Sequence, residues 1–305
     1  MGVFGYLALL TLGITLGSVF FLTASALGEM GPLLLMTVRA VLGFSFLSFL
    51  GLFLRPPVLS LLRRRFWPLL AVALANYAIS WPLIAWGQTR TESSTAGVLA
   101  ASSPIFTALI ARFLLPGEAL RLRVLLGLLV GLAGVALIAG FDFDKLGAST
   151  LTGDLAVVGG AVLFALAAVI FRRYLAGANE LGLAISMGLL CVLVLVPAAA
   201  LTYSPSDLEV SSRAWGALLI LGLVTGLGLT FPSYLWLVRR AGPVRASLVF
   251  YISPAVAVLL GWGVRGEKLD AHTIVGLLLI VTSLTLVNQA ARLPLRPRSP
   301  APLRT

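Results

Sequence analysis

Arg39 is a charged residue placed well inside an apolar segment of the chain. It lies about eight residues into a predicted helix at 31–54, roughly 12 Å from the outer end of that helix at 1.5 Å per residue. A charge at this depth in a membrane is costly unless it is paired or hydrated, so a functional role is the default hypothesis. A guanidinium there can bind a carboxylate or a phosphate. The alternative is a shallower position, or pairing with Glu29 or with backbone carbonyls.

Other polar and aromatic side chains lie in neighbouring apolar segments. Asn76 is well inside its segment and needs a hydrogen-bond partner there. An aromatic-lined pocket with few polar contacts suits a small amphipathic solute, while contacts between helices are the competing interpretation. The residues that we expect to line a substrate cavity are Arg39, Asn76, Tyr77, Trp81, Ser102, Ser103, Tyr234, Phe250, Tyr251 and Ser253.

Prolines interrupt the same segments at matched places. Proline removes a backbone hydrogen bond and frees a carbonyl, which a membrane helix tolerates only against protein or a hydrated cavity. The pattern predicts helix breaks at Pro82, Pro104, Pro232 and Pro254. Serines beside the Ser-Pro breaks can bond the freed backbone or touch a substrate, and a purely structural kink without a role in binding is an equal alternative.

These prolines belong to a duplication. At a shift of 150 residues, Pro82, Trp86, Arg90, Ala96, Ser103 and Pro104 fall on Pro232, Trp236, Arg240, Ala246, Ser253 and Pro254. A period this long indicates two fused halves, not a solenoid of short repeats. In membrane proteins, fused halves often enclose a substrate pathway where they meet.

Composition places the chain in a membrane. It is 59% hydrophobic and 11% charged with a mean hydropathy of +1.05, whereas about a quarter of a soluble domain is charged. The net charge of +11 comes from basic residues between apolar runs, which indicates membrane topology and no nucleic-acid partner. The single cysteine, Cys191, excludes a disulfide or a cysteine metal site within one chain. We expect no metal and no cofactor.

The apolar runs predict an all-α membrane protein with ten transmembrane helices, each of about 20 residues. The expected helices are 3–27, 31–54, 66–88, 94–115, 121–141, 152–173, 182–203, 214–238, 244–264 and 272–290. They form one five-helix repeat at 1–147 and a second at 148–290. A basic, proline-rich tail at 291–305 is expected to be disordered and cytoplasmic.

The charges predict the direction of each helix. With the N-terminus inside, sixteen basic residues fall in cytoplasmic loops and the tail, and five in outer loops. By the positive-inside rule both termini are cytoplasmic. Because each half then has an odd number of helices, the second half enters the membrane from the opposite side. This is the inverted-topology repeat of secondary transporters.

The sequence disfavours several other classes. It has no HExxH, no G-x-S-x-G and no Walker A motif, which argues against an intramembrane enzyme and a primary pump. A passive channel would need a filter-like loop or a ring of charge. All acidic residues map to loops or helix ends, which disfavours simple carboxylate-driven proton exchange.

Two segments, 95–139 and 244–284, resemble the two EamA-type modules of the drug/metabolite transporter superfamily. Both have a proline in mid-helix, Gly-Glu at the following turn and a glycine-rich closing helix. FALAAVIFRRYL and LWLVRRAGPVRASL resemble the second module of that family as well. The first helix departs from the family, which often has Trp-Gly where this chain has Leu16-Gly17. The resemblance implies a ten-helix exporter or carrier of small metabolites in the cytoplasmic (inner) membrane.

The leading hypothesis is therefore a secondary transporter that works by alternating access. Its expected cargo is an exported amino acid or a related amphipathic solute, bound centrally between the repeats. A multidrug or cationic-compound exporter and a passive channel are the alternatives. The expected partners are a small-molecule substrate and the lipid bilayer, for a monomer or a weak homodimer.

The predicted topology can be tested with a reporter fused to the C-terminus. A reporter enzyme that is active only in the periplasm should be silent there, because the basic tail is expected to stay in the cytoplasm. The same reporter fused after residue 145 should be active. Activity at the C-terminus would contradict the orientation.

Overall fold

A computed structural model of the protein describes residues 3–91, 93–116, 121–140, 151–256 and 270–290, and within these ranges every regular element is a helix. The first half contains α1 (Val3–Leu27), α2 (Pro32–Leu54), α3 (Val58–Ala73), the π-helix η1 (Leu74–Ala78), α4 (Ser80–Gln88), α5 (Ser93–Ala100), α6 (Ser103–Leu114) and α7 (Leu122–Ile138). The second half contains α8 (Leu151–Tyr174), α9 (Glu180–Ala200), the short 3-10 helix η3 (Pro205–Leu208), α10 (Ser212–Leu219), the π-helix η4 (Ile220–Val224), α11 (Thr230–Ala241), α12 (Pro243–Ser247) and α14 (Ala271–Ala290). Residues 249–256 are also helical.

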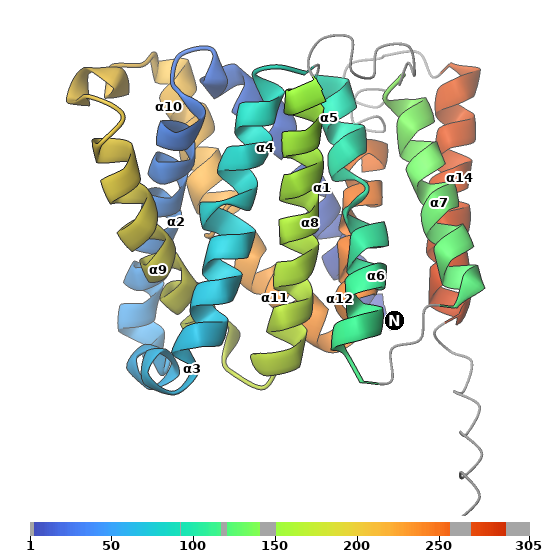
Figure 1. Ribbon diagram of the computed structural model, residues 1–305, viewed down its shortest axis with the longest axis horizontal. Coiled ribbons are helices and arrows are strands. Elements are labelled where there is room, and N and C mark those ends of the chain that lie inside the picture. Colours follow the sequence, from blue (N-terminus) through green and yellow to red (C-terminus); the bar gives the residue numbers. More distant parts are fainter. Residues whose placement is uncertain (1–2, 92, 117–120, 141–150, 257–269, 291–305) are drawn as a thin grey trace, which may run out of the picture.

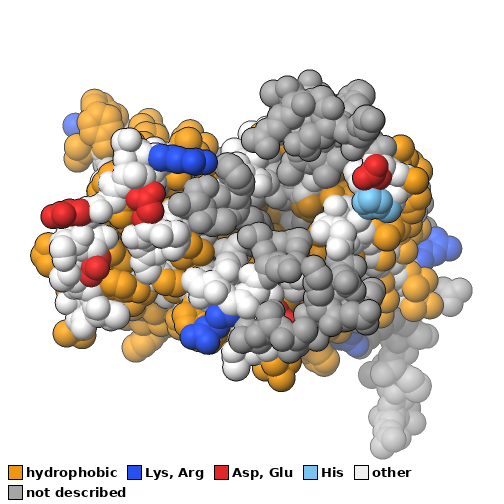
Figure 2. Space-filling model, turned by 90° about the horizontal axis from the view of Figure 1, so that it is seen from above, with side chains coloured by type: hydrophobic (Ala, Val, Ile, Leu, Met, Phe, Trp, Pro, Cys, Tyr) orange, Lys and Arg blue, Asp and Glu red, His pale blue; other side chains and the backbone are white. Residues whose placement is uncertain are grey.

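These helices lie side by side in one bundle. The α2–α3 and α8–α9 turns lie at its lower edge in Figure 1, and the α1–α2 and α9–α10 connections at its upper edge. Figure 2, seen from above, shows charged and uncharged polar side chains toward the viewer and hydrophobic side chains along the rim. Large apolar side chains such as Phe53, Trp67 and Phe113 are exposed, as expected of a surface that faces lipid.

Six helical segments of the described residues are long and apolar enough to cross a membrane. They are Pro32–Leu54, Val58–Gln88, Thr95–Leu114, Leu151–Tyr174, Glu180–Ala200 and Ala271–Asn288. Three further apolar helices, Leu7–Val19, Leu122–Ile138 and Ser212–Val224, are shorter. The predicted helix 244–264 extends into residues 257–269, which lie outside the described ranges. The all-helical membrane fold is confirmed, while the count of ten stays a prediction.

The third predicted helix in each half is interrupted by a π turn. In the first half η1 is followed by α4, whose first turn contains Pro82. In the second half η4 is followed by the irregular residues 225–229, and Pro232 lies in the first turn of α11. Proline fits a first helical turn because the amide that it lacks would have no partner there. Each proline thus lies in the first turn of the helix that follows a break.

The fourth predicted helix divides in a similar way. Residues 101 and 102 form a turn between α5 and α6, and Pro104 lies at the start of α6. Pro254 differs, because it lies inside the helical residues 249–256 and the irregular residue that precedes this helix is Leu248. Three of the four prolines therefore directly follow an interruption, and Pro254 does not.

Several contacts between helices of the two halves occur twice, once in each direction: a helix of the first half packs on a helix of the second, and the equivalent helices also pack together. α4 packs on α8 and α11 packs on α1; α3 packs on α9 and η4 packs on α2. Two further contacts, α2 with α9 and α7 with α14, join equivalent helices of the two halves. The arrangement places the third helix of each half beside helices of the other half, so the broken segments face the interface between the halves.

The α7–α14 pair, at the right of Figure 1, depends on small residues. A Cβ on Gly134 would lie 2.7 Å from the Gly276 carbonyl oxygen, and a Cβ on Gly276 would lie 2.7 Å from the Gly134 carbonyl oxygen. Such reciprocal approach is how small residues allow close packing of membrane helices.

This contact predicts the effect of one added methyl group. Gly134→Ala should reduce the free energy of unfolding by about 1–3 kcal/mol, because the backbones must separate to admit the Cβ. The matched control is Gly216→Ala in α10, where a Cβ meets nothing within 4 Å; a helical glycine replaced by alanine there should be neutral or stabilising by up to about 1 kcal/mol. Thermal unfolding in detergent measures both variants. Equal melting temperatures would contradict the packing argument.

Candidate functional site

Arg39 is buried between the two halves, with 1% of its surface exposed. From α2 its Nε donates a hydrogen bond to the Leu221 carbonyl at 3.1 Å, and its Nη2 donates to the Thr225 carbonyl at 3.1 Å. Its guanidinium carbon lies 4.7 Å from the centre of the Trp81 ring, a cation–π contact with α4. The two structural partners expected for Arg39 were Glu29 and backbone carbonyls. Arg39 bonds carbonyls, and Glu29 bonds Ser211 instead.

The broken helix explains why these carbonyls are available. In a regular α-helix the Leu221 carbonyl would accept the amide of Thr225. In η4 the Thr225 amide donates instead to the Ile220 carbonyl, at 3.0 Å. The amide of Gly228 reaches back to the Gly222 carbonyl at 3.3 Å. The π turn therefore leaves the Leu221 oxygen without a backbone donor, and it accepts instead from the Arg39 Nε and, at 3.4 Å, from the Thr225 hydroxyl.

Among the described residues, no acidic side chain balances the charge of Arg39 with an ion pair, and Tyr77 interacts with it electrostatically. Its Nη1 donates to the sulfur of Met36, at 3.8 Å, and thioether sulfur is a weak acceptor. A buried positive charge surrounded by neutral acceptors attracts an anionic group.

Aromatic side chains from both halves pack next to this charge. Tyr77 meets Phe231 edge to face with ring centres 5.2 Å apart. Phe164 packs against Tyr234 at 5.3 Å and against Phe250 at 4.9 Å. We call these five residues and Trp81 the central cluster; all six belong to one larger buried hydrophobic cluster. The six come from η1, α4, α8, α11 and the helical residues 249–256.

Two buried polar atoms in the broken third helices of the two halves lack partners among the described residues. The Asn76 Oδ1 and the Tyr234 hydroxyl are buried and make no hydrogen bond within the described part of the chain. An unpaired buried polar group typically costs about 1–3 kcal/mol, and groups of this kind in native proteins deserve a functional explanation. A bound solute with a donor for the Asn76 oxygen would remove that cost.

Both halves of the chain match one family of proteins. The sequence profile of the EamA-like transporter family matches residues 3–140 and 151–289, one match in each half. The chain belongs to the EamA-like transporter family. Its curated relatives are named as transporters, so the protein is a membrane transporter.

Several relatives are similar over most of their length. The uncharacterized inner membrane transporter YedA of Escherichia coli is 29% identical over 92% of this chain and 89% of its own. The uncharacterized transporter YoaV of Bacillus subtilis is 26% identical over 83% of this chain and 85% of its own. A crystal structure of a protein 22% identical covers 94% of this chain and 97% of that chain with a TM-score of 0.75, which supports the fold alone.

Four of the predicted site residues of this transporter lie outside the central cluster. Tyr251 packs against α7 and its hydroxyl donates to the Leu128 carbonyl at 2.8 Å. The Ser103 hydroxyl donates to the Ala161 carbonyl at 3.3 Å, and the Ser102 hydroxyl donates to the Leu99 carbonyl at 2.5 Å. Ser253 lies against Gly17 of α1. The first three hydroxyls donate to backbone carbonyls. Tyr77, Trp81, Tyr234 and Phe250 belong to the central cluster, Arg39 contacts Trp81, and Asn76 is buried in η1, one residue before Tyr77.

Sequence reasoning missed several parts of the site. Phe164 and Phe231 are ordinary apolar residues in sequence, and nothing in their neighbours distinguishes them. The sequence does indicate that carbonyls near Leu221 and Thr225 are free. The segment LGLVTGLGLT (221–230) interrupts an apolar run with closely spaced glycines. Such a segment in a membrane indicates irregular backbone that needs partners.

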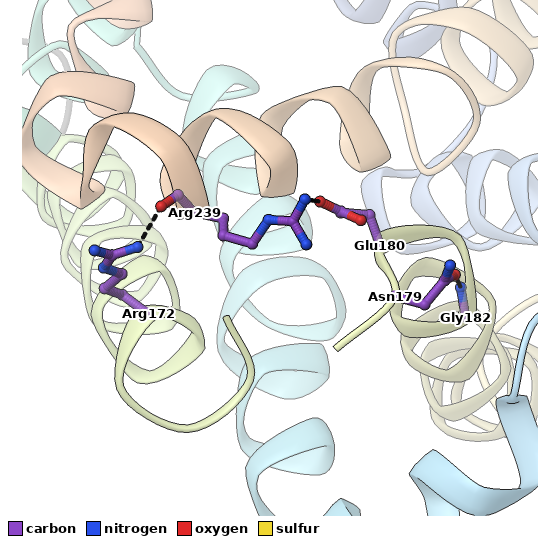
Figure 3. Close-up of polar contacts among 5 residues, drawn as sticks. All are labelled: Arg172, Asn179, Glu180, Gly182 and Arg239. Atoms are coloured by element: carbon purple, nitrogen blue, oxygen red, sulfur yellow. Dashed lines mark hydrogen bonds and ion pairs between the residues drawn. The ribbon is translucent and has the colours of Figure 1, made fainter. Parts of the chain in front are cut away.

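At the lower end, arginines link the ends of three helices, as Figure 3 shows. Arg239 at the end of α11 forms an ion pair with Glu180 at the start of α9, with 2.5 Å between Nη2 and Oε1. Arg172 at the end of α8 donates to the Arg239 carbonyl. The Asn179 side chain caps α9 by accepting the Gly182 amide at 2.9 Å. These contacts tie α8, α9 and α11 together.

At the upper end, the Glu29 carboxylate joins two parts of the chain. The Glu29 oxygens accept the Ser211 hydroxyl and amide, each at 2.6 Å, which joins the α1–α2 connection to the start of α10. These two hydrogen bonds, with a smaller contribution from the charge of Arg213, hold the pKa of Glu29 below its ordinary value. A lowered pKa means that the contact stabilises the protein at neutral pH and is lost as the pH falls through that lowered value.

Tyr251 and Tyr234 make a matched test, because the first hydroxyl is hydrogen-bonded and the second has no partner among the described residues. Tyr251→Phe should lower the free energy of unfolding by about 1 kcal/mol, because it removes the donor to the Leu128 carbonyl. Tyr234→Phe should leave stability unchanged or raise it, because its buried hydroxyl has no partner among the described residues and removing it removes a desolvation cost. Thermal unfolding of the purified variants measures the difference. A loss of stability in Tyr234→Phe as large as in Tyr251→Phe would contradict the assignment.

Proposed function

We propose that this chain is a secondary transporter that carries a small amphipathic metabolite by alternating access, through a central site between its two halves. The observation that carries the proposal is the central cluster beside Arg39, to which both halves contribute. Arg39, Tyr77 and Trp81 come from the first half, and the Leu221 carbonyl and Phe231 come from the second. A site at the junction of two repeats is typical of transporters that expose it to one side at a time.

The contacts at the two ends suggest how access alternates. The Arg239–Glu180 ion pair lies at the lower end and the Glu29–Ser211 contact at the upper end. Both are partly or fully exposed, so each contributes little free energy and can open without a large cost. Opening one end while the other stays closed would expose the central cluster to one side of the membrane.

The charges support an orientation with both termini in the cytoplasm. Arginines gather near the lower-edge turns of Figure 1, at Arg63, Arg64 and Arg65 in α3 and at Arg172 and Arg173 in α8. The exchanged helix contacts described above support an inverted repeat of two five-helix halves. In this orientation the lower end is the cytoplasmic gate and the chain lies in the cytoplasmic (inner) membrane.

The site also favours one class of cargo. An unbalanced guanidinium repels cationic compounds and attracts a carboxylate, and the neighbouring aromatic rings accommodate an apolar body. We therefore propose amino acids or related amphipathic solutes as cargo, exported from the cell by a monomer or a weak homodimer. The multidrug or cationic alternative is disfavoured by Arg39.

Transport by purified protein in liposomes tests the proposal, with α4 supplying a matched pair of variants. Trp81→Ala should reduce the exchange of a radiolabelled amphipathic amino acid at least about tenfold, the effect of roughly 1.4 kcal/mol, because Trp81 contacts Arg39. Trp86→Ala should transport normally, because Trp86 lies on the exposed side of α4, where Arg90 stacks on it. Assays run with and without a pH gradient across amino acids, nucleosides, phosphorylated sugars and cationic drugs define the cargo. Equal transport by the two variants would contradict the location of the site, and no transport of any of these solutes by the wild type would contradict the function.

A further inference from the structure

We propose that Arg39 is a switch with two alternative acceptors: the backbone carbonyls of the broken helix in one state, and the carboxylate of a bound solute in the other. The inference rests on the proposed function and adds to it a chemical group on the cargo and the movement that its binding causes. The moving part is the irregular segment of residues 225–229, between η4 and α11.

The first argument is which edge of the guanidinium is used. Nε and Nη2 point their hydrogens along the same side of the planar group, which is one of the edges that bind a carboxylate with two parallel hydrogen bonds. In the structure the Leu221 and Thr225 carbonyls accept from these two nitrogens, each at 3.1 Å. The two carbonyl oxygens therefore occupy the positions that the two oxygens of a carboxylate would take.

The second argument is the difference in charge between the two kinds of acceptor. Carbonyl oxygens accept hydrogen bonds but leave the positive charge in an apolar surrounding, and no acidic side chain of the described residues pairs with it. A carboxylate would accept the same hydrogen bonds and neutralise the charge, and hydrogen bonds between two ionised partners are roughly twice as strong as neutral ones. The exchange of carbonyls for a carboxylate is therefore favourable at the guanidinium.

The third argument is that a carboxylate cannot reach this edge unless the backbone moves. Gly226 covers it so closely that a Cβ on this residue would lie 3.0 Å from the Arg39 Nε and 2.4 Å from the Leu221 oxygen. Binding at the edge must therefore displace the segment. Because the segment leads directly into α11, its displacement would move Phe231 and Tyr234 in the central cluster, and Arg239 at the lower end.

The fourth argument is that the segment can move. It lacks regular helical hydrogen bonds: Gly228 and Leu229 donate to the Gly222 and Leu223 carbonyls, six residues back, at 3.3 and 3.1 Å. Few and long-range bonds of this kind mark a region of low local stability. A hinge of this type absorbs a conformational change at little cost to the packed helices on either side.

The test uses three probes of one shape with different charges, applied to the full-length protein in detergent. 3-Phenylpropionate carries only a carboxylate, phenylalanine carries a carboxylate and an ammonium group, and phenethylamine carries only an ammonium group. The first two should bind and raise the melting temperature of the wild type, and phenethylamine should not. Arg39→Gln should weaken binding of 3-phenylpropionate at least about tenfold, and Arg39→Lys should weaken it by less, because lysine keeps the charge but not the fork.

Hydrogen–deuterium exchange of the peptide covering 221–230 reports the movement. Exchange there should rise at least about tenfold when 3-phenylpropionate binds to the wild type, and should already be raised in Arg39→Gln without the probe. The matched control is Arg240→Gln, which removes an exposed arginine that also stacks on a tryptophan, Trp236; it should behave as wild type in both assays. If Arg39→Gln does not fold, the wild type and Arg39→Lys still give the binding and exchange comparisons.

Three results would overturn the switch. Binding of 3-phenylpropionate that is unchanged in Arg39→Gln would remove the carboxylate from Arg39, and binding of phenethylamine as tight as that of 3-phenylpropionate would reverse the chemistry. Binding that depends on Arg39 without a change of exchange at 221–230 would leave a fixed anchor and no switch. A failure of the proposed function is distinguishable, because it would show as absent transport in liposomes while the binding and exchange results still hold.

Discussion

The bond between a buried arginine and the backbone of a broken helix is the constraint on which the rest of the site depends. In the interior of a membrane protein, a guanidinium and an interrupted helix are each costly alone, because neither finds water. Here the two costs offset each other: the π turn of η4 releases carbonyls, and Arg39 donates to them. Neither element is stable in its present form without the other, which ties α2 of the first half to η4 of the second.

This coupling also explains why the small residues near Arg39 lie where they do. A Cβ on Gly43 of α2 would lie 2.9 Å from the Gly222 carbonyl, and a Cβ on Gly222 would lie 2.6 Å from the Cβ of Leu42. The two backbones must approach this closely for an arginine side chain to reach carbonyls on the neighbouring segment. The glycines of the segment 221–230 are thus required by contact with α2 as well as by the irregular backbone.

The sequence predicted the parts of this arrangement that depend on one residue and its depth. Arg39 stood out because a charge in an apolar run is rare, and three of the four matched prolines marked broken helices because the chemistry of proline is local. The side chains around the charge could not be predicted in the same way. Tyr251 was expected in the cavity but faces α7, and Phe164 was not expected but lies in the central cluster. Which side of a membrane helix meets which neighbour depends on rotation and crossing angle, and a helix that is apolar all round carries little signal about either.

α11 connects the segment bound by Arg39 with the ion pair at the lower end of the protein. One helix of 12 residues, Thr230–Ala241, begins at the segment held by Arg39, carries Phe231 and Tyr234 into the central cluster, and ends at Arg239 in the ion pair with Glu180. A helix is stiff over this length, so a displacement at its first residue is transmitted to its last instead of being absorbed between them. The contact that satisfies the buried charge and the ion pair at the lower end therefore lie at the two ends of one rigid element, so the proposed change of partner at Arg39 would have a direct mechanical route to the lower end.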